Sequence, residues 1–276
     1  MTLLAVPNVS EGREQDTIDA IAAAFGARML DVHSDPDHNR SVFTLAGEPG
    51  ALAQAVLAGA REALERIDLR AHAGAHPRIG AIDVAPIVYL SDEERGAACA
   101  EALVLADLLS VELALPVYLY GELAGGRTRA ELRRGGPAAL AERKPDFGPA
   151  HAHPTAGATL VAARPPLVAF NVELATGATL AQAREIAARI REGGPDGLPG
   201  VRAMGVWLEH RQVAQVSTNI EDHSAVTLAG VVEAIARHAE VFQAELVGLA
   251  PRAALADFPD GVPLRGRQTI EDALQS

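Results

Sequence analysis

Alternating and helically spaced apolar residues follow one another in a definite order in the first third of the chain. Alternation of apolar and polar residues predicts β-strands, and apolar positions repeating about every 3.6 residues predict amphipathic helices. In chain order the pattern predicts a strand (3–9), a helix (14–25), two strands (28–33 and 41–46), a helix (51–66) and a strand (79–90). This β-α-β-β-α-β order is that of the split βαβ or ferredoxin-like arrangement, in which a four-stranded sheet carries two helices on one face.

The second half of the chain repeats this order, although its residues do not visibly repeat. The pattern predicts a strand (166–174), a helix (179–191), a hairpin of two strands (204–209 and 213–219), a helix (225–242) and a strand (245–249). Between the two sets lie a predicted helix to residue 109 and a short strand (116–121). Ser91 with Glu94, and Thr179 with Gln182, have the spacing of capping boxes at helix starts.

These elements predict an α+β protein of two tandem ferredoxin-like (split βαβ) subdomains, each a mixed or antiparallel sheet with helices on one face. The boundary is expected near residues 163–166, which gives subdomains 1–163 and 164–276. A cleft between two such units is the expected place for a ligand.

Composition narrows the classes of partner. The 276 residues include 24 Lys and Arg and 36 Asp and Glu, which gives a net charge of −12. This negative charge repels nucleic acids and anionic membranes, so a general binding surface for either is not expected. The single cysteine, Cys99, excludes an intramolecular disulfide and cysteine-rich zinc motifs. No basic leader and no run of about eighteen apolar residues is present, so the sequence predicts a cytoplasmic protein.

The segment 71–86, AHAGAHPRIGAIDVAP, carries the strongest candidate chemistry. It places two histidines, an arginine and two glycines directly before an apolar strand, and loops held by a sheet are common positions for catalytic groups. His76 could transfer protons near neutral pH as a general acid and base, and it could equally be a turn histidine that bonds the backbone.

A metal site is the alternative for the same histidines. His72 and His76 have the i, i+4 spacing of helical ligands, and Asp35, Asp37 and His38 could add donors. A glycine between the two histidines and a proline after the second argue against a helix, and no Glu lies between them as a zinc-hydrolase motif requires. The sequence therefore predicts no metal.

Other residues fit more than one role. Arg40 and Arg78 each follow turn residues and could clamp a carboxylate, or could be solvated surface groups. The glycine-containing segment 153–164 lacks the context of a dinucleotide fingerprint or a P-loop. Ser10 does not lie in a nucleophile elbow, so no nucleophile for covalent catalysis is evident.

Taken together and in order, several motifs resemble glutamate formimidoyltransferase, the formiminotransferase part of formimidoyltransferase-cyclodeaminase, in a stand-alone form. The motifs are VPNVSEG (6–12), DPDHNRSVFTLAG (35–47), HAGAHPRIGAIDVAP (72–86), PVYLYGE (116–122), DFGP (146–149), GATLVAAR (157–164), LVAFNVEL (167–174), AQVSTN (214–219) and ELVGLAP (245–251). They cover nearly the whole chain.

This resemblance implies a homodimer that transfers a formimino group from N-formimino-L-glutamate to N5 of tetrahydrofolate, in histidine degradation. It implies that His76 is catalytic. For this reaction Arg40 and Arg78 are candidates for binding or orienting a carboxylate, and Asn39 for a hydrogen bond to the donor or the folate ring. It implies a folate-binding segment made of Ala150, His151, Ala152, His153, Pro154, Thr155, Ala156, Gly157, Ala158 and Thr159. Tetrahydrofolate is expected as a co-substrate, and no metal is required.

The chain departs from the family pattern at two places. Family sequences commonly have Lys and Glu where this chain has Ala73 and Ala75, and a Trp where it has Ala156. Three alternatives to the formimino transfer therefore stay open: a transferase that uses formylglutamate, a hydrolase of formiminoglutamate, and a folate-binding protein without catalysis.

Overall fold

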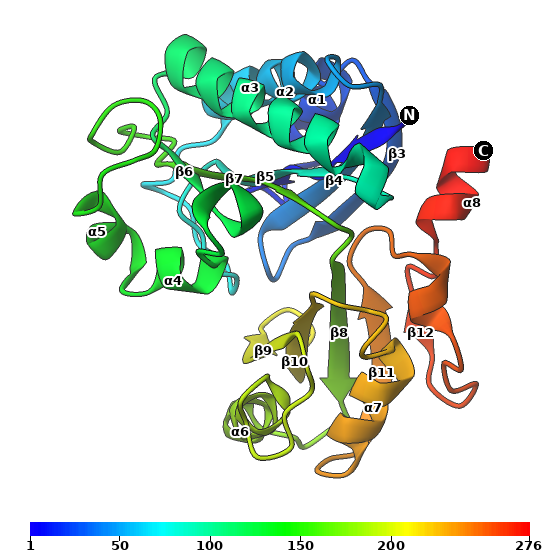
Figure 1. Cartoon of the computed structure of the whole chain (residues 1–276). Helices are drawn as coiled ribbons and strands as arrows, with labels where there is room; N and C mark the ends of the chain where they lie inside the picture. Colours follow the sequence, from blue (N-terminus) through cyan, green and yellow to red (C-terminus); the bar gives the residue numbers. More distant parts are fainter. The chain divides into compact units, whose positions relative to one another are not determined.

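The computed structural model describes all residues, Met1–Ser276, and divides into two compact units, Met1–Pro165 and Pro166–Ser276 (Figure 1). The predicted boundary after residue 163 falls within the last strand of the first unit. The elements of the first unit are β1 (Leu3–Ala5), β2 (Asn8–Val9), α1 (Gln15–Ala24), β3 (Arg28–Asp35), β4 (Arg40–Gly47), α2 (Leu52–Arg66), β5 (Ile82–Val88), α3 (Arg95–Leu113), β6 (Val117–Leu119), α4 (Arg129–Arg133), α5 (Gly136–Ala141) and β7 (Thr159–Arg164).

The first sheet has seven strands in the order β1-β4-β2-β5-β7-β6, with β3 on the outer side of β4. The predicted strand 3–9 is interrupted: β1 and β2 both lie between β4 and β5 but are separated at Pro7, which has no N–H for the ladder. The order β3, β4, β1 with β2, then β5 is that of a ferredoxin-like sheet, so the fold prediction for this unit is confirmed. β7 and β6 extend this sheet by parallel pairing.

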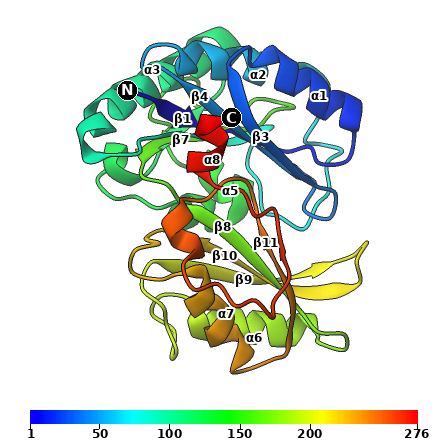
Figure 2. The same cartoon turned by 90° about the vertical axis from the view of Figure 1, so that its right-hand side faces the viewer.

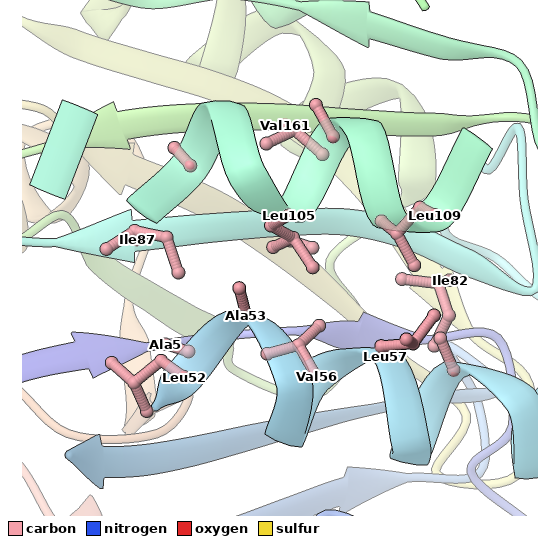
Figure 3. Close-up of a cluster of buried hydrophobic side chains, with 14 of the residues drawn as sticks. Ala5, Leu52, Ala53, Val56, Leu57, Ile82, Ile87, Leu105, Leu109 and Val161 are labelled. Carbon is pink, nitrogen blue, oxygen red and sulfur yellow. The ribbon is translucent and has the colours of Figure 1, made fainter. Parts of the chain in front are cut away.

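Helices lie on both faces of the first sheet, where the sequence predicted helices on one face only. α1, α2 and α3 cover one face, while α4 and α5 lie on the other (Figure 1). Leu52, Val56 and Leu57 of α2 meet Leu105 and Leu109 of α3 in the main core over the sheet (Figure 3). A smaller core on the opposite face joins the short helices to the sheet; its members are Ile79, Val84, Tyr118, Tyr120, Leu132, Leu140, Ala158, Leu160 and Ala162.

The second unit is a five-stranded sheet in the order β12-β11-β8-β10-β9, with α6 and α7 on one face (Figure 2). Its elements are β8 (Val168–Leu174), α6 (Leu180–Ile190), β9 (Val201–Leu208), β10 (Val213–Ile220), α7 (Leu228–Ala236), β11 (Val241–Leu246), β12 (Leu264–Arg265) and α8 (Ile270–Gln275). The order β11, β8, β10, β9 again matches the ferredoxin-like arrangement, which confirms the second subdomain.

Two predicted details need correction. The helix expected over 225–242 ends at Ala236, and Val241 and Phe242 begin β11, since β-branched and aromatic side chains suit a strand. The capping box at Ser91 does not form, because Glu94 accepts hydrogen bonds from Leu90 N (3.0 Å) and Thr2 N (3.2 Å). The box at Thr179 and Gln182 is confirmed.

Candidate functional site

The loop before β5 and the loop before β7 touch through their backbones. Gly80 and Gly157 form an isolated antiparallel bridge, Ala158 N donates to Ile79 O (3.0 Å), and Ala81 N donates to Ala156 O (2.9 Å). A Cβ on Gly80 would lie 1.9 Å from Ala158 O, and one on Gly157 would lie 2.1 Å from Ile79 O. Glycine at both positions therefore permits the segment that carries His76 to lie against the segment expected to bind folate.

His153 shapes the tip of the second loop. Its N–H donates to Gly157 O (2.8 Å) and its C=O accepts from Gly157 N (2.9 Å), which closes a tight hairpin. The Nδ1 atom of the His153 ring accepts from Ala156 N (3.1 Å). Gly157 has φ +72°, a left-handed conformation that favours glycine. Residues 153–157 are thus a preformed loop.

His76 bonds directly to the first residue of β4. The Nη1 atom of Arg40 lies 2.7 Å from Nε2 of His76. A guanidinium only donates hydrogen bonds, so Nε2 is the acceptor and the neutral ring carries its proton on Nδ1. The geometry defines the tautomer of His76 and holds its ring in place.

The charges around His76 favour the neutral imidazole. Burial of the ring, followed by the positive charges of Arg40 and Arg133, holds the pKa of His76 well below its usual value, with smaller contributions from His38 and Arg129. Burial also lowers the pKa of Arg40, to about 9, while Asp83 opposes this shift. At neutral pH His76 is therefore uncharged and able to accept a proton.

Asp83 is the carboxylate of this cluster, and it is 1% exposed. Its Oδ1 accepts from Ile79 N (2.8 Å), and its Oδ2 pairs with Nη2 of Arg133. Asp83 thereby connects the loop after His76, the strand β5 and the short helix α4. Neither Asp83 nor Arg133 was singled out by sequence analysis.

Asn39 holds the backbone of the same loop. Its Oδ1 accepts from Gly12 N (3.0 Å) and its Nδ2 donates to Ala73 O (2.9 Å). Its backbone is left-handed, with φ +49°. The side chain thus ties the loop before α1 to the His76 loop, and a contact between Asn39 and substrate stays a prediction.

A cavity of about 540 Å³ opens in the first unit beside the two loops. Arg78 lies in its wall and donates to His72 O through Nη2. Six residues of the predicted folate-binding segment also line the cavity: Ala152, His153, Pro154, Thr155, Gly157 and Ala158. Arg133 and residues of α5 also line the cavity, and the sequence pattern did not predict α5. The expected ligand position between the two units stays a prediction.

No group of three or more His, Cys, Asp or Glu side chains is arranged to hold a metal ion. His38 and His76 do approach, with ring centroids 6.2 Å apart. None of the helices has the length and apolar character needed to span a membrane.

A tandem pair of ferredoxin-like units, with a neutral histidine bonded to an arginine and a cavity lined partly by a preformed loop, defines a two-subdomain α+β protein whose first unit has a cavity of the size of a small-molecule site. The family model for the N-terminal subdomain of the formiminotransferase domain matches residues 2–164, and the formiminotransferase domain model matches residues 169–260. The chain belongs to the formiminotransferase family.

Known relatives align along nearly all of the chain. The chain is 40% identical over 279 residues to formimidoyltransferase-cyclodeaminase of Rattus norvegicus, and this alignment covers 91% of the chain and 50% of that protein. The chain is 39% identical to glutamate formimidoyltransferase of Streptococcus pyogenes serotype M1, and the alignment covers 92% of this chain and 91% of that protein. It is 36% identical to glutamate formimidoyltransferase of Thermoplasma acidophilum, and the alignment covers 91% of this chain and 89% of that protein. The chain thus spans about half the length of the rat formimidoyltransferase-cyclodeaminase and about nine-tenths of the length of the two glutamate formimidoyltransferases.

Proposed function

We propose that the chain transfers the formimino group of N-formimino-L-glutamate to N5 of tetrahydrofolate, giving 5-formimino-tetrahydrofolate and L-glutamate. The observation that carries the proposal is the neutral His76, whose Nε2 accepts a hydrogen bond from Arg40, in a segment whose residues 79–81 bond the backbone of the preformed loop. Membership of the formiminotransferase family supports the reaction type.

The reaction requires the transfer of one proton from N5 of tetrahydrofolate to the glutamate nitrogen. N5 of tetrahydrofolate attacks the amidine carbon of the donor, so an N5–C bond forms and a tetrahedral intermediate results. Collapse of the intermediate breaks the bond between that carbon and the glutamate nitrogen. The proton lost from N5 is needed by the departing amine, and a neutral His76 can accept it and then deliver it. Most of the remaining rate enhancement comes from holding both substrates close together in the reactive orientation.

Two features of the site suit these steps. The neutral imidazole accepts the proton of N5 without first losing one of its own. The surrounding arginines make the protonated ring a stronger acid, so it returns the proton readily to the glutamate amine. Arg40 must release Nε2 when this atom takes the proton, because the guanidinium cannot accept a hydrogen bond.

The cavity of about 540 Å³ is the proposed site for tetrahydrofolate. Its volume is in the range of pockets that take small organic ligands. Apolar groups such as Leu69, Pro77 and Ile79 offer a surface for the pterin ring, while the loop 153–157 offers backbone polar groups. We further propose a place in histidine degradation and a homodimer, which rest on the resemblance to the family. We also propose a cytoplasmic location, which the single cysteine fits.

The test is an assay of the purified protein with N-formimino-L-glutamate and tetrahydrofolate, in which both products are identified by mass spectrometry. The proposal predicts equal amounts of 5-formimino-tetrahydrofolate and L-glutamate. Release of glutamate without a folate product would indicate a hydrolase instead, and transfer from N-formyl-L-glutamate alone would indicate a formyl transferase. Folate binding without turnover would contradict catalysis altogether.

A further inference from the structure

Three buried polar atoms lack a hydrogen-bond partner, one on Arg40 and one on each of two residues that act on Arg40 electrostatically. They are Nε of Arg40, Nε of Arg133 and the hydroxyl oxygen of Tyr120. Tyr120 is only 5% exposed. A buried donor without a partner is costly and rare in folded proteins, so a cluster of three points to a missing hydrogen-bond acceptor.

The same region has an excess of positive charge. The positive charges of Arg133 and Arg129 both act on Arg40 and lower its pKa, and Asp83 is the carboxylate that opposes this shift. The guanidinium of Arg129 lies over the Tyr120 ring, 5.9 Å from its centroid. Because Asp83 already pairs with Arg133, the other cations remain without a full counter-charge, and the missing acceptor is expected to be an anion.

The bonds of the two proposed substrates decide which of them supplies that anion. In N-formimino-L-glutamate the nitrogen that leaves is bonded to the carbon that carries the α-carboxylate, so this carboxylate lies close to the reacting atoms. In tetrahydrofolate the reacting N5 belongs to the pterin, and the carboxylates lie beyond the p-aminobenzoyl group at the other end. Cations that act on His76 can therefore reach the carboxylate of the donor and not those of folate.

We propose that Tyr120 and Arg133, together with Arg40, bind a carboxylate of the donor beside His76. The inference rests on the proposed function and assigns the donor subsite of that reaction. Asp83 is a positioning residue, because its Oδ2 orients the Arg133 guanidinium while its Oδ1 holds Ile79 N at the end of the His76 loop. The site would select donors whose formimino group is carried by an amino acid.

Tyr120→Phe is the cleanest test. The hydroxyl has no partner in the free protein, so its removal is expected to leave the melting temperature unchanged or slightly raised. Loss of a hydrogen bond to a charged carboxylate is expected to raise the KM for N-formimino-L-glutamate about 10- to 100-fold, with the KM for tetrahydrofolate unchanged. Arg133→Lys keeps the charge but loses the fork geometry, and it should change the KM for the donor in the same direction.

Tyr89→Phe is the matched control. The Tyr89 hydroxyl donates to Oε1 of Glu122 (2.6 Å), and Tyr89 is not part of the proposed site. Its removal should lower stability and leave both KM values unchanged. A KM for the donor that is unchanged in Tyr120→Phe and Arg133→Lys would overturn the inference, and so would an increase confined to the KM for tetrahydrofolate.

Calorimetric titration with L-glutamate, without folate, separates this inference from the proposed function. The wild type should bind L-glutamate, and Tyr120→Phe should weaken the binding about tenfold or more. If the wild type transfers no formimino group, the proposed function fails, and this titration alone decides the inference. An equal Kd for L-glutamate in both proteins would then overturn it.

Discussion

Gly157→Ala tests whether the close contact between the His76 segment and the 153–157 loop creates the folate site. The new Cβ would lie 2.1 Å from Ile79 O, and the residue has φ +72°. The left-handed conformation costs an alanine about 1–2 kcal/mol. Relief of the clash moves the loop away from residues 79–81. This weakens two hydrogen bonds, Ala158 N to Ile79 O and Ala81 N to Ala156 O, each contributing about 1 kcal/mol.

The sum is about 3–4 kcal/mol, which corresponds to roughly a 100- to 1,000-fold loss of affinity if the ligand must restore the native loop. The assay is the KM for tetrahydrofolate together with the melting temperature. Gly193→Ala is the matched control, because Gly193 has φ +81° and a Cβ added there would meet no atom within 4 Å, so only the conformational cost applies. A KM for tetrahydrofolate that is the same in Gly157→Ala and the wild type would refute the reasoning.

Two further predictions concern charge. Arg40→Gln removes a cation beside His76 and should raise the pKa of the imidazole. Since the neutral imidazole is the active form, the fall of kcat/KM on the acidic side of the pH profile should move to higher pH. A fall at the same or a lower pH than in the wild type would contradict the role given to Arg40. Glu101→Ala should lower the free energy of unfolding in urea by about 3 kcal/mol, because the Glu101 carboxylate accepts from Gly50 N (2.5 Å) and Ala53 N (2.6 Å) and so caps α2 from α3. Equal stability of this variant and the wild type would show that the α2 terminus needs no cap.

The order of elements in both units could be predicted from the sequence because their strands and long helices follow regular apolar periods. α2, for example, has a continuous apolar face, and the predicted helix agrees to within a residue with Leu52–Arg66. The short helices α4 and α5 have too few turns to show a period, and glycines lie between them. The capping box of Thr128 and Glu131 was the one local pattern that could have indicated α4.

The site was predictable only in part, for a related reason. His76 and the loop 153–157 occur in motifs that resemble a known family. Tyr120 and Arg133 lie more than forty residues beyond His76 in the sequence. Tyr120 directly follows β6 and belongs to the smaller core, and Arg133 ends α4 next to Leu132 of that core. Sequence spacing alone does not reveal such pairs, because the contact of Asp83 with Arg133 depends on the tertiary fold.

The central claim is that His76 moves the proton during formimino transfer to tetrahydrofolate. The most direct measurement compares kcat/KM of His76→Ala with that of the wild type, with His223→Ala in the second unit as the control. We expect a loss of about 10²- to 10⁴-fold for His76→Ala in a folded protein, and no change for His223→Ala. Formimino transfer by His76→Ala at the rate of the wild type would contradict the account.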